Sequence, residues 1–112
     1  MNVIILPKVL DYLENLVIIL YEKEYFCFLE TSSNYVYELL IDIKMTLPIR
    51  QHRPAPKYFE KYGKGMKYAV FRKNKNTSWY VFFKTYEKNG ERIFLVCYIG
   101  NNHTVAQHLT NY

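Results

Sequence analysis

The sequence predicts an α+β fold in a single domain that covers residues 1–112. Three observations predict it. A short β-branched run opens the chain and ends at Pro7. Two segments with apolar residues at helical spacing follow, and the second half holds three aromatic-rich runs separated by turn signals. We therefore expect an N-terminal strand, two antiparallel helices, a three-stranded antiparallel meander and a short C-terminal helix.

The composition narrows the class of protein. Half of the residues are hydrophobic and 18% are aromatic, which argues against a disordered chain. Cys27 and Cys97 lack metal-ligand spacing, so we expect buried, inert thiols in a reducing compartment, and neither a metal nor a cofactor. No apolar run approaches the roughly 20 residues of a membrane helix. Without a signal-peptide pattern, the sequence predicts a cytoplasmic protein that does not bind membranes.

The charge is unevenly distributed along the chain. Residues 1–49 carry three lysines against seven acidic residues, a net charge of −4. Residues 50–112 carry twelve basic residues against three acidic ones, a net charge of +9. A basic half beside an acidic half indicates that a polyanion or an acidic partner binds the C-terminal half. The alternative is a lysine-rich surface that only contacts solvent.

The first half of the chain predicts a strand and two helices. Residues 2–6 are apolar and rich in β-branched side chains, as in a short strand. Pro7 suits the first turn of a helix, and apolar residues then recur at intervals of three and four to about Glu22. Oxygens at residues 31–33 suit an N-cap, and a second amphipathic helix follows and ends before Pro48.

A basic, proline-bounded loop over residues 49–56 connects the helices to the second half. We interpret it as a spacer, with a flap that touches phosphate as the alternative. His52 within it is expected to be structural. Residues 57–64 suit one helical turn.

The second half predicts a sheet. Its strands are expected over residues 66–72, 78–86 and 92–99. The middle run is apolar at both odd and even positions, so both of its faces are apolar, as in a central strand. Lys73–Asn76 forms a basic hairpin loop, and Asn89-Gly90 is the strongest signal for a two-residue hairpin. A short helix is expected over residues 103–109.

A two-residue turn at Asn89-Gly90 predicts the register of its two strands. The expected pairs are Lys88 with Glu91, Glu87 with Arg92, Thr85 with Phe94, Phe83 with Val96, and Val81 with Tyr98. One face then collects Trp79, Val81, Phe83, Phe94, Val96 and Tyr98, and we expect it to pack on the helices. The other face collects Tyr80, Phe82, Lys84, Tyr86, Ile93, Leu95 and Cys97, and Lys84 marks it as the more open face.

This order of elements resembles the RelE/ParE toxin superfamily of type II toxin–antitoxin modules. The similarity is closest in residues 71–83 (FRKNKNTSWYVFF) and 95–103 (LVCYIGNNH), which look like a branch often labelled plasmid-stabilisation protein. The helix from Tyr35 to Pro48 fits this branch too, so the resemblance covers nearly the whole chain. RelE-like members are similar to metal-independent ribonucleases that cut mRNA in the ribosomal A site. ParE-like members bind and block DNA gyrase, and in both groups an antitoxin wraps the toxin.

The resemblance implies roles for particular residues. Cleavage of RNA without a metal needs a base for the 2′-OH, charge on the phosphate to be stabilised, and an acid for the leaving oxygen. Trp79 stands where RelE has a strand arginine, and His108 falls near the tail tyrosine of RelE. The expected catalytic residues are His103, His108 and Arg72. The expected nucleic-acid contacts are Lys67, Lys73, Lys75, Lys84 and Arg92.

Each of these roles has a structural alternative. Both tail histidines also suit helix capping or exposure to solvent, and the cationic hairpin also suits a soluble loop. Trp79 is expected in the core. Aromatic residues around Lys84 are expected to face the antitoxin, with stacking on bases as the alternative. These residues are Tyr80, Phe82 and Tyr86.

The sequence analysis therefore predicts a toxin that acts as a ribosome-associated mRNA endoribonuclease and is neutralised by a cognate antitoxin. Two alternatives stay open. One is a non-enzymatic, ParE-like inhibitor of DNA gyrase, and the other is a RelE-like globular protein without toxicity. Homodimer formation also stays open.

Overall fold

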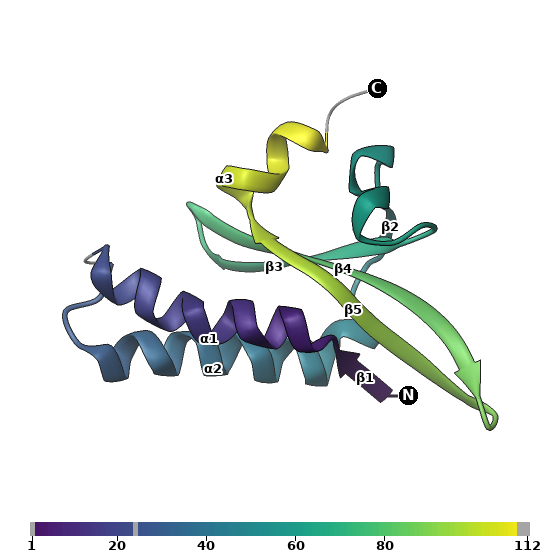
Figure 1. The fold of residues 1–112 in the computed structure, drawn as a ribbon, viewed down its shortest axis with the longest axis horizontal. Helices are drawn as coiled ribbons and strands as arrows, with labels where there is room; N and C mark the ends of the chain where they lie inside the picture. The colour runs from purple at the N-terminus through teal and green to yellow at the C-terminus, as the bar shows by residue number, and fades with distance from the viewer. Residues whose placement is uncertain (1, 24, 110–112) are drawn as a thin grey trace.

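The computed structural model describes residues 2–23 and 25–109. Its elements are β1 (Asn2–Ile5), α1 (Pro7–Glu22), α2 (Leu29–Thr46), η1 (Leu47–Ile49), β2 (Arg53–Pro54), η2 (Lys57–Tyr62), β3 (Lys67–Asn74), β4 (Thr77–Lys88), β5 (Glu91–Asn101), α3 (Asn102–Val105) and η3 (Ala106–His108). The predicted α+β class is confirmed. Figure 1 shows α1 and α2 on one side of a twisted sheet, with η2 and α3 on the other.

The sheet has five strands in the order β1-β5-β4-β3-β2. β1 runs parallel to β5, and the pairs β2–β3, β3–β4 and β4–β5 are antiparallel. The sequence predicts four strands, because two residues in the proline-bounded loop carry no strand signal. These two residues form β2, which pairs with Tyr68 and Lys67 of β3. β4 is central, as its apolar pattern predicts.

The predicted register of the β4–β5 hairpin is confirmed from the Asn89-Gly90 turn to the pair of Phe83 with Val96. The next predicted pair is wrong, because Val81 faces Ile99 rather than Tyr98. A bulge leaves Cys97 without a partner in the pairing, between Phe82↔Tyr98 and Phe83↔Val96. An extra residue reverses the alternation of the strand. Tyr98 therefore lies on the face opposite to the one predicted.

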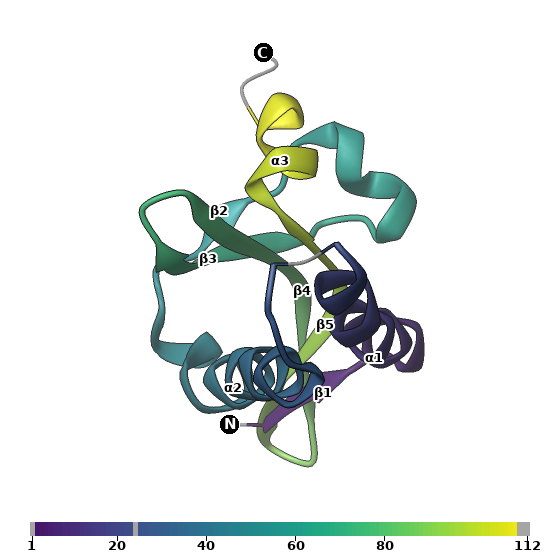
Figure 2. The same ribbon diagram turned by 90° about the vertical axis from the view of Figure 1, so that its left-hand side faces the viewer.

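The helices cover one face of the sheet (Figure 2), where the larger hydrophobic core lies. β4 contributes Trp79, Val81 and Phe83 to it, as predicted, and Trp79 is 2% exposed. Helix residues three and four apart, such as Leu13 and Leu16 of α1 and Leu39 and Ile43 of α2, supply the other side of this core.

The second face of the sheet, predicted to be the more open one, is also covered and has a core of its own. Phe59 of η2 stacks on Phe82 with ring centroids 4.3 Å apart, and the two side chains are 1% and 0% exposed. Val105 of α3 and the buried Cys97 join this second core. The prediction that Phe82 faces an antitoxin is therefore wrong, because chain segments before and after the sheet fold over it. Cys27, predicted to be buried, is exposed.

A serine that the sequence suggests as a cap instead joins the two helices. α2 begins at Leu29, earlier than predicted, and no side chain caps its N-terminus. Ser32 is fully buried, and its hydroxyl donates a hydrogen bond to the carbonyl oxygen of Val17 in α1 at 2.6 Å. This hydrogen bond links α2 to α1 inside the helix layer. Among the described residues, no helix is long and apolar enough to cross a membrane.

Replacing Ser32 tests this link between the helices. Ser32→Ala removes the only polar partner that α2 offers to Val17 among the described contacts, and we expect a loss of about 1 kcal/mol in the free energy of unfolding. Urea denaturation followed by circular dichroism measures it. Ser33→Ala, at an exposed neighbouring position, is the matched control and should stay within about 0.5 kcal/mol. Equal effects of the two substitutions would contradict the assignment.

The raised pKa of Tyr98 makes the free energy of unfolding depend on pH in the alkaline range. Burial, and then the neighbouring Tyr62, raise the pKa of Tyr98 to about 12. An unfolded tyrosine titrates near pH 10, so between roughly pH 10 and 12 the unfolded state loses this proton before the folded state does. This contribution to stability is present below pH 10 and is lost as the pH rises through 12. Tyr98→Phe should therefore make alkaline unfolding less steep, as urea midpoints at pH 9, 10 and 11 would report. An unchanged slope would contradict the assignment.

Candidate functional site

A cleft opens where the β3–β4 hairpin, the α1–α2 connection and the start of α3 meet. Its volume is about 270 Å³. It is lined by Leu20, Tyr25, Phe26, Tyr35, Asn74, Thr77, Trp79, Asn101 and His103. We call it the hairpin cleft. It contains one of the three predicted catalytic residues, His103, and it contains no carboxylate among the described lining residues.

The asparagine pair before His103 fixes its position. The side-chain oxygen of Asn101 accepts hydrogen bonds from the backbone N–H of His103 at 2.9 Å and of Thr104 at 3.2 Å, as an N-cap does. Asn102 bridges α3 to the hairpin, since its oxygen accepts the Ser78 N–H and its amide nitrogen donates to the carbonyl oxygen of Asn76. The Asn101 cap and the Asn102 bridge therefore hold the backbone at His103, whose exposed side chain lines the cleft.

A hydrogen bond connects Trp79 of the core to Tyr35, and both side chains line the cleft. The indole Nε1–H of Trp79 donates a hydrogen bond to the hydroxyl oxygen of Tyr35 at 2.9 Å. Because the Tyr35 oxygen accepts this bond, its own proton can be donated to a ligand in the cleft. The ammonium of Lys73 lies 5.3 Å from the centroid of the Tyr35 ring. Trp79 thus orients the phenol of Tyr35, which lines the hairpin cleft.

The other cations predicted to act on nucleic acid divide between the β3–β4 hairpin and more distant parts of the sheet. Arg72 is exposed at the β3–β4 hairpin, and its Nε–H donates to the carbonyl oxygen of Asn74, while Lys75 is in the turn itself. Lys67 is exposed at the start of β3. Lys84 lies against Gly63, where a Cβ would be 2.7 Å from its Cε. Arg92 pairs with Glu87 at 3.1 Å, beside the other hairpin.

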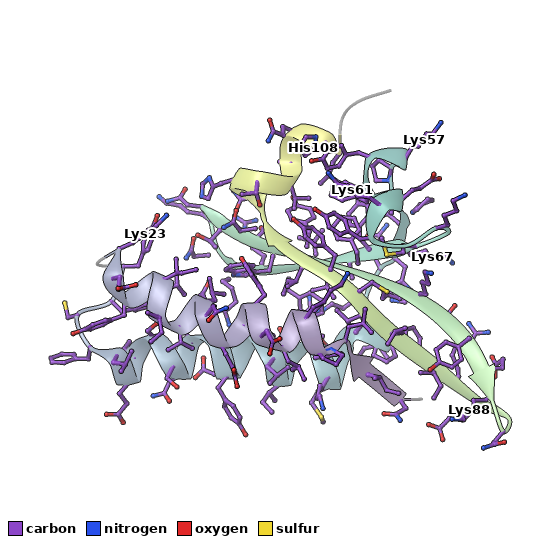
Figure 3. All side chains as sticks on the ribbon, in the orientation of Figure 1. Lys23, Lys57, Lys61, Lys67, Lys88 and His108 are labelled. Carbon is purple, nitrogen blue, oxygen red and sulfur yellow. The ribbon has the colours of Figure 1, made fainter. Side chains whose placement is uncertain are left out.

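His108 belongs to a different group. Its ring stacks on Tyr58 of η2, with centroids 3.5 Å apart and an interplanar angle of 5°. The ammonium of Lys61 lies 4.0 Å from the centroid of the same Tyr58 ring. Figure 3 shows Lys57, Lys61 and His108 together at this end of the molecule and Lys88 at the opposite end. His108 therefore packs η3 against η2, and it does not line the hairpin cleft.

The remaining predicted residues divide by burial. Tyr80 is half-buried against the second core, and Tyr86 is 43% exposed. His52 is structural, as predicted. Its Nε2 lies 2.8 Å from the carbonyl oxygen of Leu47, and its ring packs edge-on against Phe83.

Several residues of the cleft carry no functional signal in the sequence. Tyr35 has helical spacing that predicts a core position, and Asn74 has only the composition of a turn. Asn101 and Asn102 are part of the segment that carries the resemblance, but only the structure shows that Asn102 reaches the hairpin. Within residues 2–23 and 25–109, no group of three or more His, Cys, Asp or Glu side chains is placed to bind a metal ion. Comparisons with family models, with curated proteins and with solved structures gave no match.

The bridge made by Asn102 can be tested by hydrogen exchange. Asn102→Ala removes the acceptor of the Ser78 N–H and releases the hairpin from α3. We expect exchange of the Ser78 amide to accelerate by a few-fold to about tenfold, as the loss of one hydrogen bond implies. Gln107→Ala, at an exposed position of η3, is the matched control. Unchanged exchange at Ser78 would show that the bridge does not hold the hairpin.

Proposed function

We propose that this protein is the toxin of a type II toxin–antitoxin module and that it cuts mRNA at the hairpin cleft. One observation carries the proposal: His103 and Tyr35 line the cleft beside the cationic hairpin, and the ammonium of Lys73 lies 5.3 Å from the centroid of the Tyr35 ring. These three groups supply a base, an acid and a positive charge, which together suffice for transfer at a phosphodiester.

In the proposed reaction, neutral His103 takes the proton from the 2′-OH of the substrate. The 2′-oxygen attacks the adjacent phosphorus, and the bond from phosphorus to the 5′-oxygen breaks. The hydroxyl of Tyr35 gives its proton to the leaving 5′-oxygen, while Lys73 stabilises the negative charge on the phosphate. The products are a 2′,3′-cyclic phosphate and a free 5′-OH. The proton on His103 returns to Tyr35 through solvent.

Arg72 and Lys75 support the proposal as contacts outside the cleft. Both lie on the exposed part of the β3–β4 hairpin, where they would bind phosphates on either side of the cut. Arg72 therefore acts in binding rather than in proton transfer. Lys67, Lys84 and Arg92 lie on other parts of the sheet and would add only general attraction for RNA.

The proposed antitoxin requires an apolar surface, and the outer sides of α1 and α2 offer one. They expose Ile18, Ile19, Tyr37, Ile41 and Met45, which are 39–73% accessible. Large exposed apolar side chains on neighbouring helices are typical of protein-binding surfaces. The same surface supports the second candidate, a non-enzymatic inhibitor of DNA gyrase that acts in the cytoplasm through protein contacts alone.

Substitutions in the cleft separate these candidates. We expect His103→Ala to lower the rate of cleavage of ribosome-bound mRNA by about 10²–10⁴-fold, the contribution of a general base. His108→Phe keeps the stack on Tyr58 and should leave the rate unchanged.

Lys73→Met should lower the rate by roughly tenfold or more through lost charge stabilisation, whereas Lys88→Met, at the far hairpin, is its matched control. Primer extension under single-turnover conditions measures the rates.

Three outcomes would contradict the endoribonuclease. Cuts that persist in His103→Ala would remove the general base from the mechanism. Equal effects of Lys73→Met and Lys88→Met would leave no specific role for Lys73. Loss of DNA supercoiling in induced cells, without cuts in mRNA, would favour the gyrase inhibitor.

A further inference from the structure

A second cavity of about 310 Å³ lies between α1, β5, η2 and α3. It is lined by Lys8, Val9, Tyr12, Tyr62, Cys97, Tyr98, Ile99, Gly100 and Thr104. We call it the tyrosine pocket. It shares no lining residue with the hairpin cleft. The reaction proposed above therefore does not use it.

The short first strand creates the opening. β1 pairs with β5 only as far as Ile5 and Val96, because Pro7 ends the strand and begins α1. Beyond Val96, β5 pairs with β4 alone among the described strands. The first turns of α1 then pass the uncovered edge of β5 and present Lys8 and Tyr12 to it.

The β-bulge supplies the aromatic wall. Because the extra residue Cys97 shifts the alternation, Tyr98 lies on the η2 side of the sheet. Its ring stacks on Tyr62 with centroids 4.0 Å apart and an interplanar angle of 8°. Gly100 lets α3 approach the strand, since a Cβ there would lie 2.6 Å from a methyl of Val105. The aromatic wall is thus held by η2 through Tyr62 and flanked by α3 at Gly100.

The polar groups of the pocket are donors at neutral pH. Burial raises the pKa of both Tyr98 and Tyr12, so their phenols keep their protons. Burial also raises the pKa of the Cys97 thiol. The ammonium of Lys8 lies 6.0 Å from the centroid of the Tyr62 ring, and no carboxylate is among the described lining residues. A ligand here meets one positive charge and several O–H donors on aromatic and aliphatic walls.

We propose that the tyrosine pocket binds a small aromatic carboxylate. The ring of such a ligand matches the apolar and aromatic walls, and its carboxylate matches Lys8 and the phenolic donors. The volume is near the lower end of the range for small-molecule sites, about 300–1,000 Å³, which suits one ring with one anionic group.

Calorimetric titration of the whole chain with benzoate and benzamide tests the proposal, because these probes share a shape and differ in charge. Benzoate should bind at least about tenfold more tightly than benzamide, as expected for one charge-assisted contact. Lys8→Met keeps the aliphatic stem and should abolish this difference. Lys23→Met, at the C-terminal end of the same helix, should preserve it. Amide shifts on adding benzoate should centre on Gly100 and Thr104.

Any of four results would overturn the proposal. Benzamide binds as well as benzoate, or Lys8→Met leaves the preference intact. Inorganic phosphate or uridine 3′-monophosphate competes with benzoate and binds more tightly, which would assign the pocket to nucleotides. Benzoate causes no saturable heat and no shift at Gly100. Circular dichroism of Lys8→Met, a change at an exposed site, verifies that the variant is folded.

Discussion

The structure depends on the burial of β4 on both faces. Phe82 and Phe83 are consecutive residues, they point to opposite faces of the sheet, and they are 0% and 1% exposed. The helices bury Phe83, and η2 buries Phe82. A central strand that is apolar at both parities cannot leave either face to solvent without a large cost. The chain therefore places α1 and α2 on one side of the sheet and η2 and α3 on the other.

Both cavities follow from this three-layer arrangement. The hairpin cleft lies where the helix layer ends beside the β3–β4 hairpin, and Trp79 extends from the buried core to hold the Tyr35 hydroxyl. The tyrosine pocket lies where the layer of η2 and α3 meets the edge of β5. The Tyr35 hydroxyl is thus held by a side chain that belongs to the core, which fixes its orientation.

The local patterns in the sequence predicted much of the fold. Pro7 marked the start of α1, Asn89-Gly90 fixed the register near the turn, and Trp79 was expected in the core. The bulge at Cys97 was not predictable, because nothing in the local sequence distinguishes it from an ordinary strand position. The burial of Phe82 was also missed, because it depends on the distant Phe59, and alternation within a strand does not report what covers a face. For the site, His103 was predicted to lie at a functional position, whereas Tyr35 joins it only through packing between distant segments.

The parallel pairing of β1 with β5 has a consequence for the order of folding. β1 begins at Asn2, and its partner residues are Ile93 to Val96, so this contact closes a loop that contains most of the chain. The α1–α2 pair and the two hairpins need only local contacts and can form earlier. During synthesis, β1 has no partner in the sheet until β5 leaves the ribosome. β1 therefore stays unpaired while β3 and β4 are made, and the tyrosine pocket beside it, which β5 lines, cannot form before then.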